Sequence, residues 1–212
     1  MLATMHELEF DQTISIKVTP NDHCYWKEFH STQSGTSSAT GDGSFVYNYT
    51  IKSDDTIYIV VAKQKVDVIV DTNGYKNVAV SDTNFIKQGD NFVWNTDYFA
   101  IENMALSSAV SKISNVGYDL LSVSGSNDYS KKFSSFITST TSEKENITLT
   151  LEYSPVDVNI ILDYGYEYIA GQTTKTLTTK FGSAFETADG WEESPTRTGY
   201  EIVGWSRDSV GI

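Results

Sequence analysis

The sequence predicts a mostly β protein made of tandem small repeat units, with one helix inserted in the middle unit. Apolar and polar residues alternate over many short segments, as they do in half-buried strands. Clusters of Gly, Pro, Asn and Asp separate these segments, as turns between strands require. A succession of strand-like segments and Gly-Tyr pairs recurs about ninety residues later in the chain, which indicates internal repeats.

Composition limits the classes of function. The chain has 212 residues, a formal net charge of -13 and 13% aromatic residues, so it can bury apolar cores. An acidic surface repels phosphates, which argues against a nucleic-acid partner. No apolar run is long enough to span a membrane. The single cysteine, Cys24, excludes an internal disulfide, so packing must supply the stability.

The first unit, residues 1–64, contains four expected strands. Each has alternating or aromatic-rich apolar residues and ends at a turn signal; they cover 8–19, the stretch around Tyr25, Trp26 and Phe29, 45–51, and 57–61. Residues 31–44 are Ser, Thr, Gly and Asp with almost nothing apolar, which predicts an exposed loop.

The middle unit, residues 65–155, continues the strand pattern and supplies the repeat. The segments Ile57–Val61, Val66–Asp71 and Gly74-Tyr75 have counterparts in Ile147–Leu151, Val156–Ile160 and Gly165-Tyr166. Residues 85–92 similarly parallel residues 177–185. Residues 97–113 place Phe99, Leu106 and Ile113 at helical spacing, which predicts the one helix. Phe133 and Phe136 predict a further strand between two polar loops.

The last unit, residues 156–212, ends in a turn followed by an expected strand, Pro195–Trp205. The same pattern occurs at Gly117–Val123 and, less clearly, at Cys24–Phe29. If the units share a fold, the last one lacks its final strand. Either the protein continues, or a partner adds a strand to the sheet, or the short unit is complete as it stands.

The Gly-Tyr strand carries a resemblance to a known family. Together with Val158–Gly165 and Lys180–Ser183, the stretch Pro195–Trp205 resembles the internalin B-repeat, also called the Listeria–Bacteroides repeat. Ile202 stands where that family usually has an aromatic residue, and the middle unit has Val123 in place of its Trp. The resemblance implies a small β-grasp-like fold and a spacer or adhesive module outside a bacterial cell.

Catalytic and metal chemistry find little support. Cys24 and His23 are adjacent, so on a strand their side chains would point to opposite faces rather than form a nucleophile pair. His6, His23 and His30 match no metal-ligand spacing. Asp71–Gly74 has its Gly in the wrong position for a calcium loop and predicts a hairpin turn instead. We therefore expect no catalytic residues, no cofactor and no metal.

Aromatic residues are the best candidates for binding. The four tryptophans are Trp26, Trp94, Trp191 and Trp205. The resemblance places Trp205 in the core, whereas Trp191 lies in a polar loop and is the candidate ligand contact. Asn48 and Asn146 begin glycosylation sequons, which matter only in a eukaryotic secretory pathway.

These observations predict a non-enzymatic structural or adhesive module. Its expected setting is the extracellular surface of a bacterium, where it would act as a spacer or binding part. Residues 1–7 do not resemble a signal peptide, so the alternative is a bacteriophage virion protein, a fibre or capsid decoration. A carbohydrate-binding accessory module is the third hypothesis. The expected partner is a protein, bound by strand addition to the last unit, or a surface glycan.

Overall fold

The computed structural model of the chain is mostly β, with 49% strand and 9% helix, which confirms the predicted fold class. It describes residues 9–31, 35–37, 44–167, 171–191, 196–201 and 203–205. Contacts divide the chain into two compact units. The first contains residues 1–114 and 122–152, and the second contains 115–121 and 153–212.

The first strands form two small sheets. One pairs β1 (Thr13–Val18) with β4 (Phe45–Thr50), and the other has the order β3 (Gly35–Ser37), β2 (Cys24–Ser31), β5 (Ile57–Lys63). The predicted loop 31–44 is therefore wrong at β3, where backbone pairing with β2 holds residues that have no apolar pattern. The rest of that loop lies outside the described residues, apart from its two ends.

Strand β2 buries two consecutive aromatic side chains, so both of its faces are covered at this point. Tyr25 and Trp26 are 7% and 2% exposed. The register between β2 and β5 shifts between Trp26 and Glu28, which marks a β-bulge. Tyr25 and Trp26 precede this bulge and pair in regular register with Ala62 and Val61, so their side chains lie on opposite faces of the strand.

A larger sheet follows. Its order among the described residues is β7, β10, β11, β12, β6, β9, β8. Those strands are β6 (Lys65–Asp71), β7 (Val78–Val80), β8 (Ile86–Gln88), β9 (Asn91–Asp97), β10 (Ile113–Asn115), β11 (Tyr118–Val123) and β12 (Lys144–Pro155). Strands β10, β11 and β12 each have residues in both compact units.

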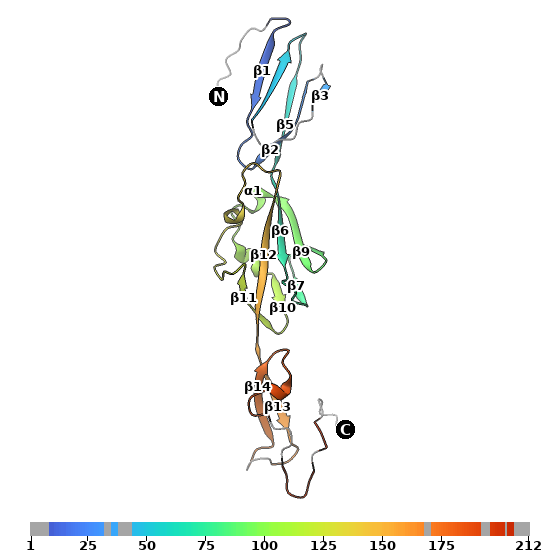
Figure 1. The fold of residues 1–212 in the computed structure, drawn as a ribbon, viewed down its shortest axis with the longest axis vertical. Coiled ribbons are helices and arrows are strands. Elements are labelled where there is room, and N and C mark those ends of the chain that lie inside the picture. Colours follow the sequence, from blue (N-terminus) through green and yellow to red (C-terminus); the bar gives the residue numbers. More distant parts are fainter. Residues whose placement is uncertain are drawn as a thin grey trace. The chain divides into compact units, whose positions relative to one another are not determined.

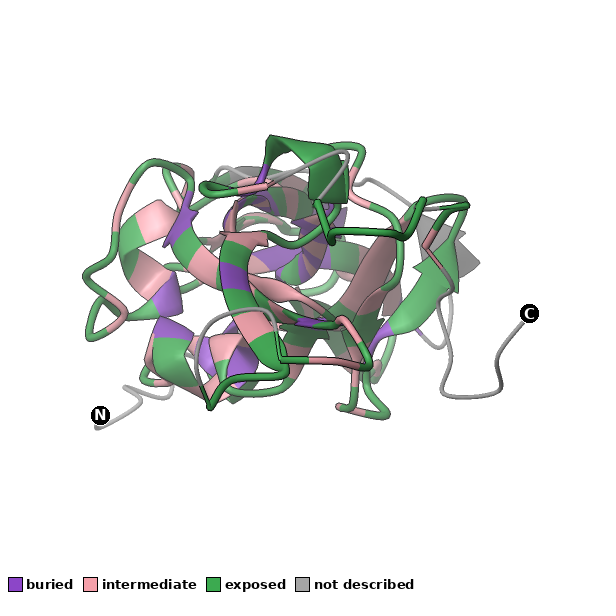
Figure 2. Ribbon diagram, turned by 90° about the horizontal axis from the view of Figure 1, so that it is seen from below, coloured by how far each residue is buried: buried purple, intermediate pink, exposed green. Residues whose placement is uncertain are grey.

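Strands β6 and β12 are parallel neighbours near the middle of this sheet (Figure 1). They pair from Lys65 opposite Lys144 to Asp71 opposite Thr150. Every second residue of each strand is buried, as the alternation predicted; these residues are Val66, Val68, Val70, Ile147, Leu149 and Leu151. Figure 2 shows the buried residues as short bands that interrupt exposed and half-buried stretches of the strands.

The predicted single helix is two short helices, α1 (Tyr98–Ile101) and α2 (Leu106–Val110). Leu106 is buried in α2, but Phe99 is 41% exposed and Ile113 lies in β10, so the predicted apolar spacing holds only in part. The chain is extended at Ala105, and the amides of Leu106 and Ser107 donate to carbonyls of the 129–131 segment. An outside segment thus supplies the hydrogen-bond acceptors, and the helix does not continue through residues 102–105.

The predicted strand around Phe133 and Phe136 is also wrong. These residues form the 3-10 helix η1 (Phe133–Phe136). A spacing of three residues puts two side chains on opposite faces of a strand but on the same side of a 3-10 turn. Phe133 is fully buried, and its amide donates to the carbonyl of Met104 at 3.0 Å, which anchors this turn.

The C-terminal part contains β13 (Asp157–Asp163), β14 (Thr174–Lys180) and the 3-10 helix η2 (Phe185–Thr187). Arg197 and Tyr200 form an isolated bridge around the predicted Gly199 turn. The expected strand beyond this turn is wrong for the described residues, because Glu201 and residues 203–205 have no strand structure. Gly204 has a φ of 148°, which a continuing strand would not adopt. Ile202 lies outside the described residues.

Three antiparallel strand pairs, β1/β4, β6/β9 and β13/β14, share one set of contacts. A backbone amide just after the second strand donates to the carbonyl just before the first: Ile51 to Gln12, Tyr98 to Gln64, and Phe181 to Val156. The first paired residues join through side chains: Thr13 with Thr50 (2.9 Å), Lys65 with Asp97 (2.6 Å), and Asp157 with Lys180 (2.6 Å). Two residues further on, the side chains bond again: Ser15 to Asn48, Asn95 to Asp67, and Thr178 to Asn159.

This common set aligns the strand pairs differently from the sequence comparison. It matches β9 with β14, whereas the predicted match joined residues 85–92 to residues 177–185. That match does not hold, because β8 pairs with β9 while Leu177 lies in β14, directly beside β13.

Candidate functional site

The chain passes from β5 into β6 through one buried residue, Gln64, which is 0% exposed. Its amide donates to the His23 carbonyl at 2.8 Å, and its carbonyl accepts from the Tyr98 amide at 3.0 Å. Its side-chain oxygen lies 2.8 Å from His23 Nδ1, and its side-chain nitrogen donates to the Ser139 carbonyl at 3.0 Å. Gln64 is therefore hydrogen-bonded through both its backbone and its side chain, which restricts rotation where β5 continues into β6. We call Gln64 and these partners the first crossing.

His23 contacts both the backbone and the side chain of Gln64 in the first crossing. It has a φ of 58°, and its ring stacks on Tyr98 with centroids 3.5 Å apart and planes within 8°. The adjacent Cys24 begins β2, opposite Lys63 of β5. His23 thus packs at a chain crossing, and its nitrogen contacts an amide rather than a thiol.

The chain passes from β12 into β13 through Val156. The Val156 amide donates to the Gly117 carbonyl at 3.1 Å, and its carbonyl accepts from the Phe181 amide at 2.9 Å. Gly117 has a φ of 83°, and a Cβ there would lie 2.4 Å from the Phe181 ring. Tyr118 packs edge-on against Phe181 with centroids 5.5 Å apart. We call Val156 and these partners the second crossing, and all of its residues belong to the second compact unit.

The two crossings follow one plan with different residues. Each connecting residue donates to the carbonyl of a residue with positive φ, His23 or Gly117. Each accepts from an aromatic residue, Tyr98 or Phe181, whose ring lies against that same positive-φ residue. In each case a single residue separates the two strands.

Trp191, the predicted ligand contact, is half-buried in an aromatic cluster. It lies edge-on to Phe185 at 4.8 Å and tilted against Trp205 at 5.5 Å between ring centroids. Both tryptophans pack on a small core whose buried members are Leu162, Leu177 and Ala188. Trp205 was expected in the core but is partly buried and packs against it, and Trp191 offers only part of its ring to a ligand.

A second aromatic group lies at the Gly199 turn. The Arg197 guanidinium lies 4.0 Å from the Tyr200 ring centroid and 4.4 Å from that of Tyr166. Tyr200 is 68% exposed, so its ring is more accessible than Trp191. Sequence reasoning missed this group, because Tyr166 and Arg197 are thirty-one positions apart and no periodic signal joins them.

The other described residues that the sequence singled out lie in strands or in a turn. Trp26 is buried in β2 and Trp94 is half-buried in β9, against Phe85. Asn48 and Asn146 lie within strands β4 and β12. At Asp71–Gly74 the Asp71 carboxylate accepts the Asn73 amide in a turn, but the predicted hairpin is wrong, because β6 and β7 on either side of this turn are not neighbours in the sheet. His6 lies outside the described residues, among which no group of three His, Cys, Asp or Glu could hold a metal ion.

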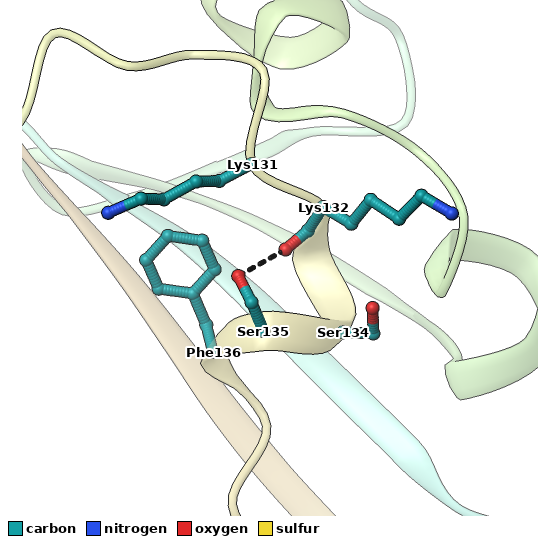
Figure 3. A pocket seen from close by; sticks show the side chains of 5 residues that line it. All are labelled: Lys131, Lys132, Ser134, Ser135 and Phe136. Atoms are coloured by element: carbon teal, nitrogen blue, oxygen red, sulfur yellow. Dashed lines mark hydrogen bonds between the residues drawn. The ribbon is translucent and has the colours of Figure 1, made fainter.

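An open hollow of about 500 Å³ lies beside η1 and is lined by Lys131, Lys132, Ser134, Ser135 and Phe136 (Figure 3). The Lys132 ammonium donates to Asn103, and the Ser135 hydroxyl donates to the Lys132 carbonyl. Figure 3 shows the Lys131 side chain running beside the Phe136 ring, while Lys132 points the other way. No nucleophile, base and orienting group converge in this hollow, so it does not form a recognisable catalytic site.

No family model, curated protein or solved structure matches this chain. Among the described residues, no helix is long and apolar enough to cross a membrane.

Proposed function

We propose that the chain is a non-enzymatic structural or adhesive module that carries tension as a spacer or binding part of a bacterial surface protein. The observation that carries the proposal is the parallel pairing of β6 with β12. The chain enters this sheet at Lys65 and leaves it at Pro155, so these are the first and last strands of the segment.

Parallel first and last strands resist pulling from the chain ends. Tension applied through Gln64 and Val156 slides β6 along β12 and loads the hydrogen bonds between Lys65–Asp71 and Lys144–Thr150 together. Peeling the strands from one end would instead break those bonds one at a time. The bonded crossing residues deliver the force directly into the strands, which suits a spacer.

Single-molecule pulling tests this role. In one protein the handles are attached to the chain ends, and in another to cysteines introduced by Lys76→Cys and Glu152→Cys, with Cys24→Ser in the latter. The second geometry peels β6 from β12, because both attachments lie near the same end of the strands. We expect a several-fold higher unfolding force from the chain ends. Equal forces in the two geometries would contradict a load-bearing role.

The virion alternative requires the same mechanical property. The resemblance of Pro195–Trp205 to the internalin B-repeat favours the cell surface. Antibody labelling of intact bacteria from the natural source, compared with labelling of purified phage particles, separates the two settings.

Glycan binding is a second candidate, favoured by the exposed Tyr200 beside Arg197. Exposed aromatic rings and guanidinium groups are frequent anchors in recognition surfaces. Retention on a glycan array, lost with Tyr200→Ala or Trp191→Ala, would support this function. Tyr200→Ala is the cleaner variant because Trp191 also packs in the core. An array without retained glycans would remove the support for this candidate.

A further inference from the structure

Within the described part of the chain, strand β13 pairs with β14 and with no other strand. Strand β6, whose contacts match those of β13, has neighbours on both sides. In the larger sheet, β6 lies between β9 and β12. The contacts shared by β6/β9 and β13/β14 identify the edge of β13 that corresponds to the edge where β12 binds β6.

The hydrogen-bond pattern identifies the backbone groups on this edge. The Phe181 amide donates to Val156, and the Tyr164 amide donates to Thr173, so even-numbered residues of β13 face β14. Antiparallel ladders alternate, so the amides and carbonyls of the odd-numbered residues point to the other side. Those residues are Asp157, Asn159, Ile161 and Asp163. In β6, Lys65 is also odd-numbered, and its amide donates to Glu143 just before β12.

The side chains of these four residues are exposed, and Ile161 is 67% exposed. No proline occurs in β13, and its only charged residues are the aspartates at its two ends. Lysine, proline and bulges are the usual means by which proteins block a sheet edge. The middle of this edge, Asn159 to Ile161, has none of them.

We propose that this edge of β13 accepts one parallel strand from a partner polypeptide. The register of β12 on β6 predicts apolar partner residues opposite Ile160 and Leu162, because Ile147 and Leu149 occupy those positions opposite Val68 and Val70. Small polar residues are expected opposite Asn159 and Ile161.

Charge further specifies the incoming strand. Asp157 is already paired with Lys180, whereas Asp163 is exposed and accepts the Gly165 amide. A Lys or Arg opposite Asp163 would complement that charge. In the larger sheet, Thr150 lies opposite Asp71 and donates a hydrogen bond to it at 3.4 Å. The partner strand therefore alternates apolar and small polar residues and ends in a basic residue.

This inference rests on the proposed binding role and specifies its partner, but its test is independent of the pulling experiment. That experiment loads β6 and β12, whereas the strand site lies on β13. A failure of strand addition would leave the force measurement unchanged, and equal pulling forces would not affect peptide binding.

The probe is a synthetic peptide with the sequence of residues 144–155 in which Thr150 is replaced by Lys, added to the full chain. We expect amide hydrogen exchange at Asn159, Ile161 and Asp163 to slow at least tenfold, and that at Ile160 and Leu162 to stay unchanged. A spin label at the peptide's N-terminus should broaden resonances near Asp157 for a parallel strand. Absence of this alternate protection, or broadening near Asp163, would overturn the proposal.

Two variants at one position control for folding. Ile161→Pro removes an amide that faces the free edge and leaves the even-numbered ladder to β14 in place. Ile161→Thr keeps that amide and changes only an exposed side chain. We expect Ile161→Pro to weaken peptide binding at least tenfold and Ile161→Thr to change it less than twofold. Equal binding by both variants would contradict the site.

Discussion

The substitution Gly117→Ala adds one methyl group to the second crossing, and we expect it to lower the stability strongly. Gly117 has a φ of 83°, where an L-residue costs about 1–2 kcal/mol. The new Cβ would also lie 2.4 Å from carbons of the Phe181 ring, so the ring must move. Overpacking of this kind costs about 1–3 kcal/mol. The sum, about 2–5 kcal/mol, is a large part of the stability of a small domain.

Two companions separate the backbone term from the steric term. Gly165→Ala has a similar φ, 65°, and no atom within 4 Å, so it should cost only about 1–2 kcal/mol. Gly117→Ala made together with Phe181→Ala should likewise cost only the backbone term relative to Phe181→Ala alone. Amide hydrogen exchange in the ladder between β13 and β14 reports the stability of the second unit by itself. Equal costs for Gly117→Ala and Gly165→Ala would refute the predicted steric contact.

Two further predictions concern the first compact unit, which contains residues 1–114 and 122–152. Gln64→Ala should lower the free energy of unfolding by about 2–4 kcal/mol in urea, because it creates a cavity and leaves the half-buried Ser139 carbonyl and His23 without their partner. Burial raises the pKa of Asp67, but hydrogen bonds from Lys144 and Asn95 and the Lys144 charge outweigh this, so the pKa lies below its ordinary value. The associated stability is present above about pH 4 and is lost as the pH falls through the lowered pKa, so Asp67→Asn should show a smaller loss of urea midpoint between about pH 6 and 2.

Alternation was a reliable guide to strands because it reports directly which face of a strand meets the core. Val66, Val68 and Val70 are all fully buried, as their spacing predicted. The repeat comparison matched Val66 with Val156, whereas the shared contacts match Gln64 with Val156. A shift of two residues keeps every side chain on its face, so apolar pattern alone could not detect the error.

Other features depend on contacts that no local pattern encodes. Residues 97–113 have helical spacing, yet the helix stops because carbonyls at Tyr129 and Lys131 take the amides of α2. Trp191 lies in a polar loop of the sequence, but Phe185 and Trp205 enclose part of its ring. Polar neighbours in sequence do not report which distant aromatic rings will pack on a side chain.

The three strand pairs suggest why their common design is hard to detect by comparing residues. At the first paired position one pair joins two hydroxyls, one joins Lys65 to Asp97, and one joins Asp157 to Lys180 with the charges exchanged. A comparison of residue identities scores each of these as a mismatch, and an exchanged charge scores worst. The physical requirement is only that two facing side chains attract one another across the ladder. A search for strand pairs of this kind should therefore score the two facing positions jointly, together with the backbone hydrogen bond that precedes them.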